Sequence, residues 1–255
     1  MVDSNRGVMF YLKKQELKTD PLQLLSKNWQ KTMQQLELSA KDARLKAFYQ
    51  AGAVAADTAL QDTSFVALDF ETTGLDPVRD GIVSIGLVPL TLERIYSSKA
   101  QSYLVKPRIQ LKDSSVIVHG ITDSVIAQAP DLEQYIEPLL HALAGKVVLV
   151  HHLPIERAFL YHGLMSRIKE GVVFPMIDTL ALERGFTQSG LKGWWRSMTA
   201  QAKPSLRLAD CRRRYQLPAY QPHHAVTDAM GCAELFQAQV ARHLSASTPV
   251  GKLWS

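Results

Sequence analysis

Two carboxylates stand two residues apart where the sequence predicts the end of a β-strand. Asp69 lies near the end of the apolar run FVALDF (65–70), and Glu71 directly follows that run. Side chains at positions i and i+2 of a strand point to the same face. With their Cα atoms ~7 Å apart, the two charges repel each other unless a cation lies between them. Oxygen ligands of this kind suit Mg²⁺ or Mn²⁺, so the pair is a candidate metal site.

Two later segments offer further groups for the same chemistry. The run HHAVTDA (223–229) places His223 five residues before Asp228 at the start of a predicted helix, where they can supply a proton acceptor and a metal ligand. The run HHLPIERAFL (151–160) begins another helix and carries Glu156 in its first turn. Small residues directly after the first acids form a turn that lets a ligand approach the backbone closely, and we expect them to contact substrate: Thr72, Thr73 and Gly74.

A basic stretch indicates a polyanionic substrate. The chain has a net charge of +5, but residues 184–214 alone hold eight Lys/Arg and one acid, Asp210. Within this stretch Trp194 and Trp195 lie next to Lys192 and Arg196, a composition that suits single-stranded nucleic acid because bases stack and phosphates pair with cations. Packing of one Trp on the core is an equally good explanation of that pair. The basic side chains that we expect to contact phosphate are Lys192, Arg196, Arg207 and Arg212–Arg214.

The elements that must position these groups follow from hydrophobic periodicity. Strands are predicted at 65–70, 81–90, 100–105 and 147–150, and helices at 131–144, 154–162, 177–184, 205–215 and 224–243. Before them, residues 1–60 read as amphipathic helices that pack against the domain or against a second copy of it. This order predicts an α/β protein with a mixed sheet. We expect an N-terminal helical extension (1–60), one catalytic domain (61–245) and a short tail (246–255).

Composition excludes several classes of protein. The chain has 255 residues, of which 46% are apolar and 21% charged, so it is neither wholly disordered nor fibrous. It contains no apolar run near the ~18 residues of a membrane span, and its first residues do not resemble a secretory signal. Its two cysteines, Cys211 and Cys232, form neither a disulfide framework nor a zinc motif. We therefore expect a cytoplasmic protein with no membrane association.

Taken together and in order, these motifs resemble the DEDDh (DnaQ-like) 3′→5′ exonucleases over roughly residues 64–240. The resemblance rests on D-x-E-T-T-G (69–74), VHGIT (118–122) and H-x-A-x-x-D-A (223–229). It implies an RNase H-like fold, a mixed five-stranded sheet flanked by helices. The family usually has H-N-x-x-F-D at its second motif, where this chain has His151, His152 and, in place of Asp, Glu156. We expect one of the two histidines to be packed or hydrogen-bonded, and Asp178 to cap a helix.

The resemblance also implies two-metal hydrolysis of a phosphodiester. Asp69 would bridge both Mg²⁺ or Mn²⁺ ions, Glu71 and Asp228 would complete the ion that holds the attacking water, and Glu156 would support the second. His223 would take the proton from the water, since histidine titrates near neutral pH. The product would be a nucleoside 5′-monophosphate released from a 3′ end.

Three functions remain open at this point. The leading one is a 3′→5′ exonuclease on single-stranded DNA, and the second is an exoribonuclease that trims RNA 3′ ends. The third is a catalytically weakened nucleic-acid-binding accessory module, suggested only by Glu156. We expect no stable polymerase partner, because the tail after the last helix contains no evident tethering segment. A homodimer stays open.

Overall fold

The protein is built on one mixed sheet of five strands. The computed structural model describes residues 28–109, 123–188 and 204–255. The strands lie in the order β3-β2-β1-β4-β5. Pairing is antiparallel from β1 to β2 and from β2 to β3, and parallel from β1 to β4 and from β4 to β5. The strands are β1 (Phe65–Thr72), β2 (Ile82–Leu90), β3 (Gln101–Leu104), β4 (Val147–Val150) and β5 (Met176–Asp178). The predicted α/β class with a mixed five-stranded sheet is confirmed.

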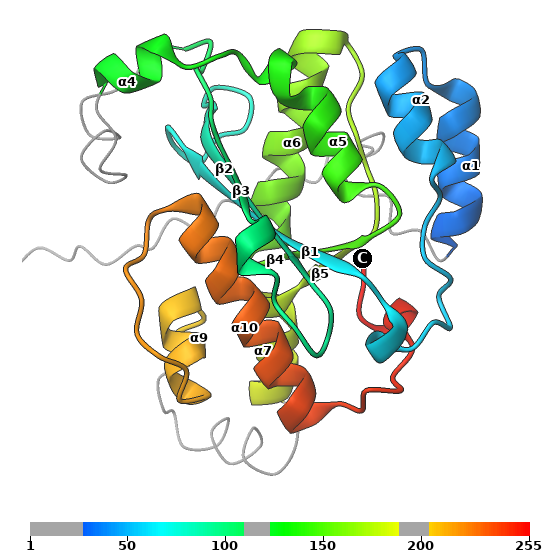
Figure 1. The fold of residues 1–255 in the computed structure, drawn as a ribbon, viewed down its shortest axis with the longest axis vertical. Coiled ribbons are helices and arrows are strands. Elements are labelled where there is room, and N and C mark those ends of the chain that lie inside the picture. The colour runs from blue at the N-terminus through cyan, green and yellow to red at the C-terminus, as the bar shows by residue number, and fades with distance from the viewer. Residues whose placement is uncertain (1–27, 110–122, 189–203) are drawn as a thin grey trace, which may run out of the picture.

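Helices cover both faces of this sheet (Figure 1). On one side lie α5 (Ile136–Leu143) and α6 (Leu153–Ile168), with α1 (Trp29–Ser39) and α2 (Ala43–Gln50) beyond α5. On the other side lie α7 (Thr179–Gln188), α9 (Leu208–Arg214) and α10 (Ala225–His243). The remaining elements are α4 (Asp123–Gln128) and the 3₁₀ turns η3 (Leu60–Asp62), η4 (Ser97–Lys99), η5 (Leu132–Tyr135) and η6 (Val250–Lys252).

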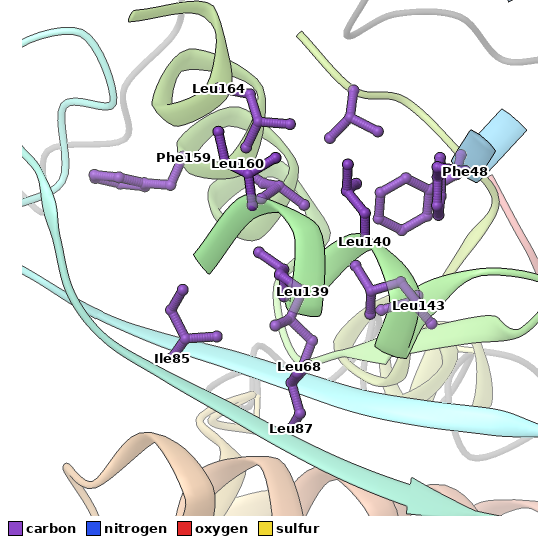
Figure 2. Packing of buried hydrophobic residues seen from close by; sticks show 14 of the residues in the cluster. Phe48, Leu68, Ile85, Leu87, Leu139, Leu140, Leu143, Phe159, Leu160 and Leu164 are labelled. Atoms are coloured by element: carbon purple, nitrogen blue, oxygen red, sulfur yellow. The ribbon is translucent and has the colours of Figure 1, made fainter. Parts of the chain in front are cut away.

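Strand β1 divides the core into two clusters, because its side chains alternate between the two faces. Val66, Leu68 and Phe70 join the larger cluster with α5, α6 and the N-terminal helices. Figure 2 shows Leu139 of α5 between Leu68 of β1 and Leu160 of α6 within this cluster. Phe65 and Ala67 face the smaller cluster with α10. Asp69 and Glu71 continue the second set, so the alternation directs both acids toward α10.

The described N-terminal helices pack on this larger cluster. Met33 of α1 and Phe48 of α2 are 2% and 4% exposed, and the ring of Phe48 lies 5.4 Å from that of Phe174. Residues 28–50 therefore contribute to the same core as the sheet, as expected for helices packed against the domain.

One predicted helix is partly wrong. The helix predicted from Ile177 begins only at Thr179, because Met176–Asp178 form β5 and pair with β4. The edge of β5 is in turn covered by the C-terminal segment, where Ser255 and Met176 exchange two backbone hydrogen bonds of 2.9 and 3.2 Å. Arg157 of α6 donates to the Ser255 carbonyl, which links this segment to the first turns of α6.

Candidate active site

Three of the predicted carboxylates converge at one end of the sheet. Asp69 and Glu71 of β1 and Asp228 of α10 offer oxygen atoms that all lie within 4.8 Å of one another. Glu71 is only 6% exposed. Carboxylates this close repel each other unless protons or cations separate them. The arrangement therefore suits a divalent cation with oxygen ligands.

Glu156 adds a fourth carboxylate from α6. It is 5% exposed, and its Oε2 atom is buried without a hydrogen-bond partner. Burial and, next, the charges of Glu156, Asp228 and Glu71 raise the pKa of Asp69 well above the ordinary carboxyl value. Burial, with Asp178 as a further contributor, also raises the pKa of Glu156. A buried carboxylate oxygen costs free energy when nothing pairs with it. Beside this cluster, that oxygen of Glu156 is available to coordinate a cation, so the residues present fit a divalent metal.

Hydrogen bonds to residues outside α6 hold the start of this helix, which carries Glu156. His152 adopts a left-handed conformation (φ 105°), and its amide donates to Asp178 Oδ1 at 3.0 Å. The same oxygen accepts the Leu180 amide at 2.9 Å, so the predicted cap at Asp178 is confirmed. His151 hydrogen-bonds through one ring nitrogen to Thr179 Oγ1 and through the other to the Leu206 carbonyl. His151 is thus the hydrogen-bonded member of the histidine pair, and burial lowers its pKa.

His223 lies next to the carboxylate cluster in the loop before α10. Its backbone is left-handed (φ 69°), and its amide donates to Asp228 Oδ2 at 2.9 Å. The residue is exposed to solvent. Its imidazole is therefore accessible to water and substrate at the edge of the cluster. Sequence reasoning missed Tyr220 of the same loop, whose hydroxyl faces the Asp228 carboxylate as a hydrogen-bond donor and lowers the pKa of that group against the larger effect of burial; no motif marks that position.

The small residues of the turn after β1 form hydrogen bonds with nearby backbone groups of the protein. Thr72 Oγ1 donates to the Gly74 carbonyl, and Thr73 Oγ1 accepts the Gly81 amide at 3.0 Å. A Cβ atom on Gly74 would lie 2.3 Å from Asp80 Oδ2. A side chain at position 74 would therefore displace the Asp80 carboxylate, which accepts the Asp76 amide within this turn.

A cavity of about 260 Å³ lies beside this turn. It reaches from Asp80 and Gly81 to α6, and apolar residues such as Ile82 and Phe159 form part of its wall. Phe159 lies about one helical turn from Glu156. The cavity is also lined by two basic residues, Arg108 and Arg167, which both pair with Asp131.

The basic stretch divides into residues with different roles. The expectation of a phosphate contact is wrong for Arg212, which is 3% exposed and paired with Glu234 of α10. Arg214 is engaged by Glu183 at 2.9 Å and by the Ser205 carbonyl. Arg213 pairs with Asp210, but its side chain is 79% exposed and can contact solvent or substrate. Four predicted substrate residues and the VHGIT segment lie outside the described residues: Lys192, Trp194, Trp195 and Arg196.

In the described parts of the chain, no helix combines the length and the apolar character needed to cross a membrane.

Comparison with known proteins agrees with the geometry. A family model, RNase_T, described as "Exonuclease", matches residues 66–236. A PolC-type DNA polymerase III of Thermotoga petrophila is 27% identical over 71% of this chain, and DNA polymerase III subunit epsilon of Treponema pallidum is 27% identical over 72% of it. The matched region spans 12% of the first relative and 79% of the second.

A solved structure shares the fold. The nuclease domain of 3′hExo, a DEDDh family member bound to rAMP, superposes with a TM-score of 0.58 at 18% identity. The superposition covers 71% of this chain and 92% of that one. At this level of identity the likeness concerns the fold alone, which is the RNase H-like fold that the family resemblance implied.

Proposed function

Because this chain belongs to the RNase_T family of exonucleases, we propose that it hydrolyses single-stranded DNA from the 3′ end and releases nucleoside 5′-monophosphates. The observation that carries the proposal is the convergence of Asp69, Glu71 and Asp228 within 4.8 Å. Glu156, buried beside them with an unpaired oxygen, supports it.

We propose that these four carboxylates hold two Mg²⁺ or Mn²⁺ ions. Asp69 would be the ligand shared by both ions, since the charges of all three other acids raise its pKa. When bound, the ions would neutralise the carboxylates, lower the pKa of water and stabilise the charge of the transition state. Glu71 and Asp228 would then serve one ion with Asp69, and Glu156 would serve the other.

His223 is the proposed general base. Its ring is exposed at the edge of the cluster, and its backbone is fixed by the hydrogen bond from its amide to Asp228. A side chain in this position can accept the proton of the attacking water while the carboxylates remain occupied with cations. The bond between phosphorus and the 3′-oxygen of the penultimate nucleotide then breaks; that oxygen takes up a proton and stays on the shortened strand, and the terminal nucleotide leaves with the phosphate on its 5′-oxygen.

A single strand suits the depth of the site. Glu71 and Glu156 are both nearly buried, so a terminal phosphodiester must enter the site away from a paired strand. The cavity beside the Thr72–Gly74 turn has room for a nucleobase and an apolar wall to contact it. Thr72, Thr73 and Gly74 would contact the terminal nucleotide, and Lys192, Trp194, Trp195 and Arg196 would contact the strand.

DNA is the proposed substrate because the two relatives are named as DNA polymerase III proteins. RNA is the second candidate, since the 3′hExo domain of the same fold was solved with rAMP. The cytoplasm is the proposed compartment, in accord with two free cysteines among the described residues.

Degradation assays separate these candidates. End-labelled single-stranded DNA, duplex DNA and RNA of one sequence would be incubated with the protein and Mg²⁺, Mn²⁺ or EDTA. The proposal predicts the highest kcat/KM on single-stranded DNA with either metal. Faster trimming of RNA would replace DNA by RNA as the substrate, and binding without degradation would favour the accessory module.

A further inference from the structure

Arg212 of α9 is a buried cation that joins three parts of the structure. Its guanidinium donates to the Gly231 carbonyl of α10 and to the Pro218 carbonyl of the following loop, each at 3.0 Å. It also pairs with Glu234, one turn further along α10. The backbone carbonyl of Arg212 accepts the amides of Tyr215 and Leu217. The start of the loop that carries His223 is thus attached to both α9 and α10.

The use of arginine at this position is informative. Burying a guanidinium is costly unless most of its donors are satisfied and a counter-charge is near; here Glu234 supplies the counter-charge, and the Nε atom is left without a hydrogen-bond partner. Its planar fork lets one side chain bond two carbonyl groups and a carboxylate at fixed angles, which lysine cannot do. Arg213, the next residue, is exposed and makes none of these contacts. The Arg212 side chain therefore constrains the positions of α9, α10 and the following loop relative to one another.

Tyr220 carries this constraint from Arg212 to the carboxylate cluster. Its ring lies 4.7 Å from the Arg212 guanidinium carbon, a cation–π contact. The ring also lies against α10 at Gly231, where an added Cβ atom would be 3.4 Å from Tyr220 Cζ. Gly231 lies about one helical turn from Asp228 on α10, and the Tyr220 hydroxyl is within reach of the Asp228 carboxylate as a hydrogen-bond donor. That carboxylate also accepts the amide of His223, which comes three residues after Tyr220 in the same loop.

We propose that Tyr220 and Arg212 are positioning residues that orient Asp228 for metal binding and hold the His223 loop beside it. The inference rests on the proposed function of this site. The Asp228 carboxylate accepts the His223 amide and faces the Tyr220 hydroxyl of the same loop, so its orientation and that of the loop are coupled. Arg212 acts through Tyr220 and the Pro218 carbonyl and touches no substrate. Groups that orient metal ligands in this way typically change metal affinity by about 10- to 100-fold when removed.

Mn²⁺ binding without nucleic acid tests the proposal. Free Mn²⁺ would be followed by electron paramagnetic resonance during titration of wild type, Tyr220→Phe and Arg212→Lys. Tyr220→Phe removes one oxygen and keeps the ring, so its Tm in EDTA should match wild type while its Kd for Mn²⁺ rises about tenfold. On single-stranded DNA its kcat should fall with little change in KM. Arg212→Lys should weaken Mn²⁺ binding similarly.

Arg213→Gln is the matched control for metal affinity, because it removes a neighbouring but exposed arginine of the same helix. Its Kd for Mn²⁺ should equal that of wild type. Should Arg212→Lys fail to fold, Tyr220→Phe decides the question. A Tyr220→Phe protein that binds Mn²⁺ within about twofold of wild type overturns this inference alone. A wild-type protein that neither binds Mn²⁺ nor degrades DNA overturns the proposed function as well.

Discussion

The backbone of Ala225, at the start of α10, lies directly against Gly86 of β2. A Cβ atom on Gly86 would be 2.2 Å from the Ala225 carbonyl carbon and 2.4 Å from the Val226 nitrogen. Gly86 is also the residue paired with Asp69 across the β1–β2 ladder. The missing side chain therefore lets the first turn of α10 reach the sheet where Asp69 points at it. This contact places Asp228 beside Asp69.

Gly86→Ala should separate the two halves of the carboxylate cluster. The new methyl group meets backbone, which cannot rotate away, so α10 must shift; overpacking of this kind costs about 1–3 kcal/mol. We expect a lower Tm, weaker Mn²⁺ binding and a large loss of kcat. Gly185→Ala is the control, because an added Cβ there meets nothing within 4 Å and alanine favours a helix. Equal Mn²⁺ affinity in Gly86→Ala and wild type would contradict the role of this contact.

Glu156→Gln should uncouple activity from stability. The amide removes a buried negative charge at nearly constant shape, so the metal-free protein should be at least as stable as wild type. Loss of one preorganised electrostatic group should cost at least ~2 kcal/mol of transition-state stabilisation, measured as kcat/KM. Glu137→Gln, at an exposed position in the first turn of α5, is the control. Unchanged kcat/KM in Glu156→Gln would remove Glu156 from the active site.

Glu156→Asp tests whether the longer side chain is fitted to its place. Glu156 is buried near the start of a helix whose first turn contains Pro154 and whose preceding backbone is held by Asp178. We expect Asp to leave its carboxylate short of the cluster and to lower kcat/KM, more with Mg²⁺ than with Mn²⁺, since Mg²⁺ demands stricter geometry. An Asp variant faster than wild type would indicate that Glu156 holds its ion loosely.

The metal-free protein should lose stability as the pH rises. Burial and neighbouring charges raise the pKa of Asp69 and of Glu156 above their values in an unfolded chain. The folded state therefore binds more protons than the unfolded state above the ordinary carboxyl range. The free energy of unfolding falls as pH increases through that window. Urea unfolding in EDTA at several pH values should show a shallower fall for Asp69→Asn than for wild type. Parallel curves would show that the raised pKa values do not govern stability.

Salt dependence should distinguish Lys192 and Arg196 from Arg213 of α9. A phosphate contact on a single strand contributes a slope of about −0.7 to log K against log salt. Replacing Lys192 and Arg196 by Gln should flatten this slope for oligonucleotide binding, and Arg213→Gln should do so by at most one contact. A slope identical to wild type in the Lys192/Arg196 variant would show that those side chains do not meet phosphate.

Local patterns predicted most of the fold, and the family motifs marked the three acids that the structure brings together, Asp69, Glu71 and Asp228. Runs such as FVALDF and VVLV form β1 and β4 because apolar, β-branched residues suit a buried strand. Strand β5 could not be predicted, since its three residues are strand-forming only through pairing with β4, and the sequence runs directly into a helical pattern. Neither could the buried role of Arg212, because its partners Gly231, Glu234 and Pro218 are brought to it by tertiary packing.

The most direct test of the account follows the metal requirement at Asp69. Single-stranded DNA labelled at its 5′ end would be incubated with wild type and Asp69→Asn, each in Mg²⁺ and in excess EDTA, and released products would be identified by mass. The account predicts stepwise shortening from the 3′ end and free nucleoside 5′-monophosphates only for wild type with Mg²⁺, while Asp69→Asn stays folded. Full activity in EDTA, or near-wild-type activity in Asp69→Asn, would contradict it.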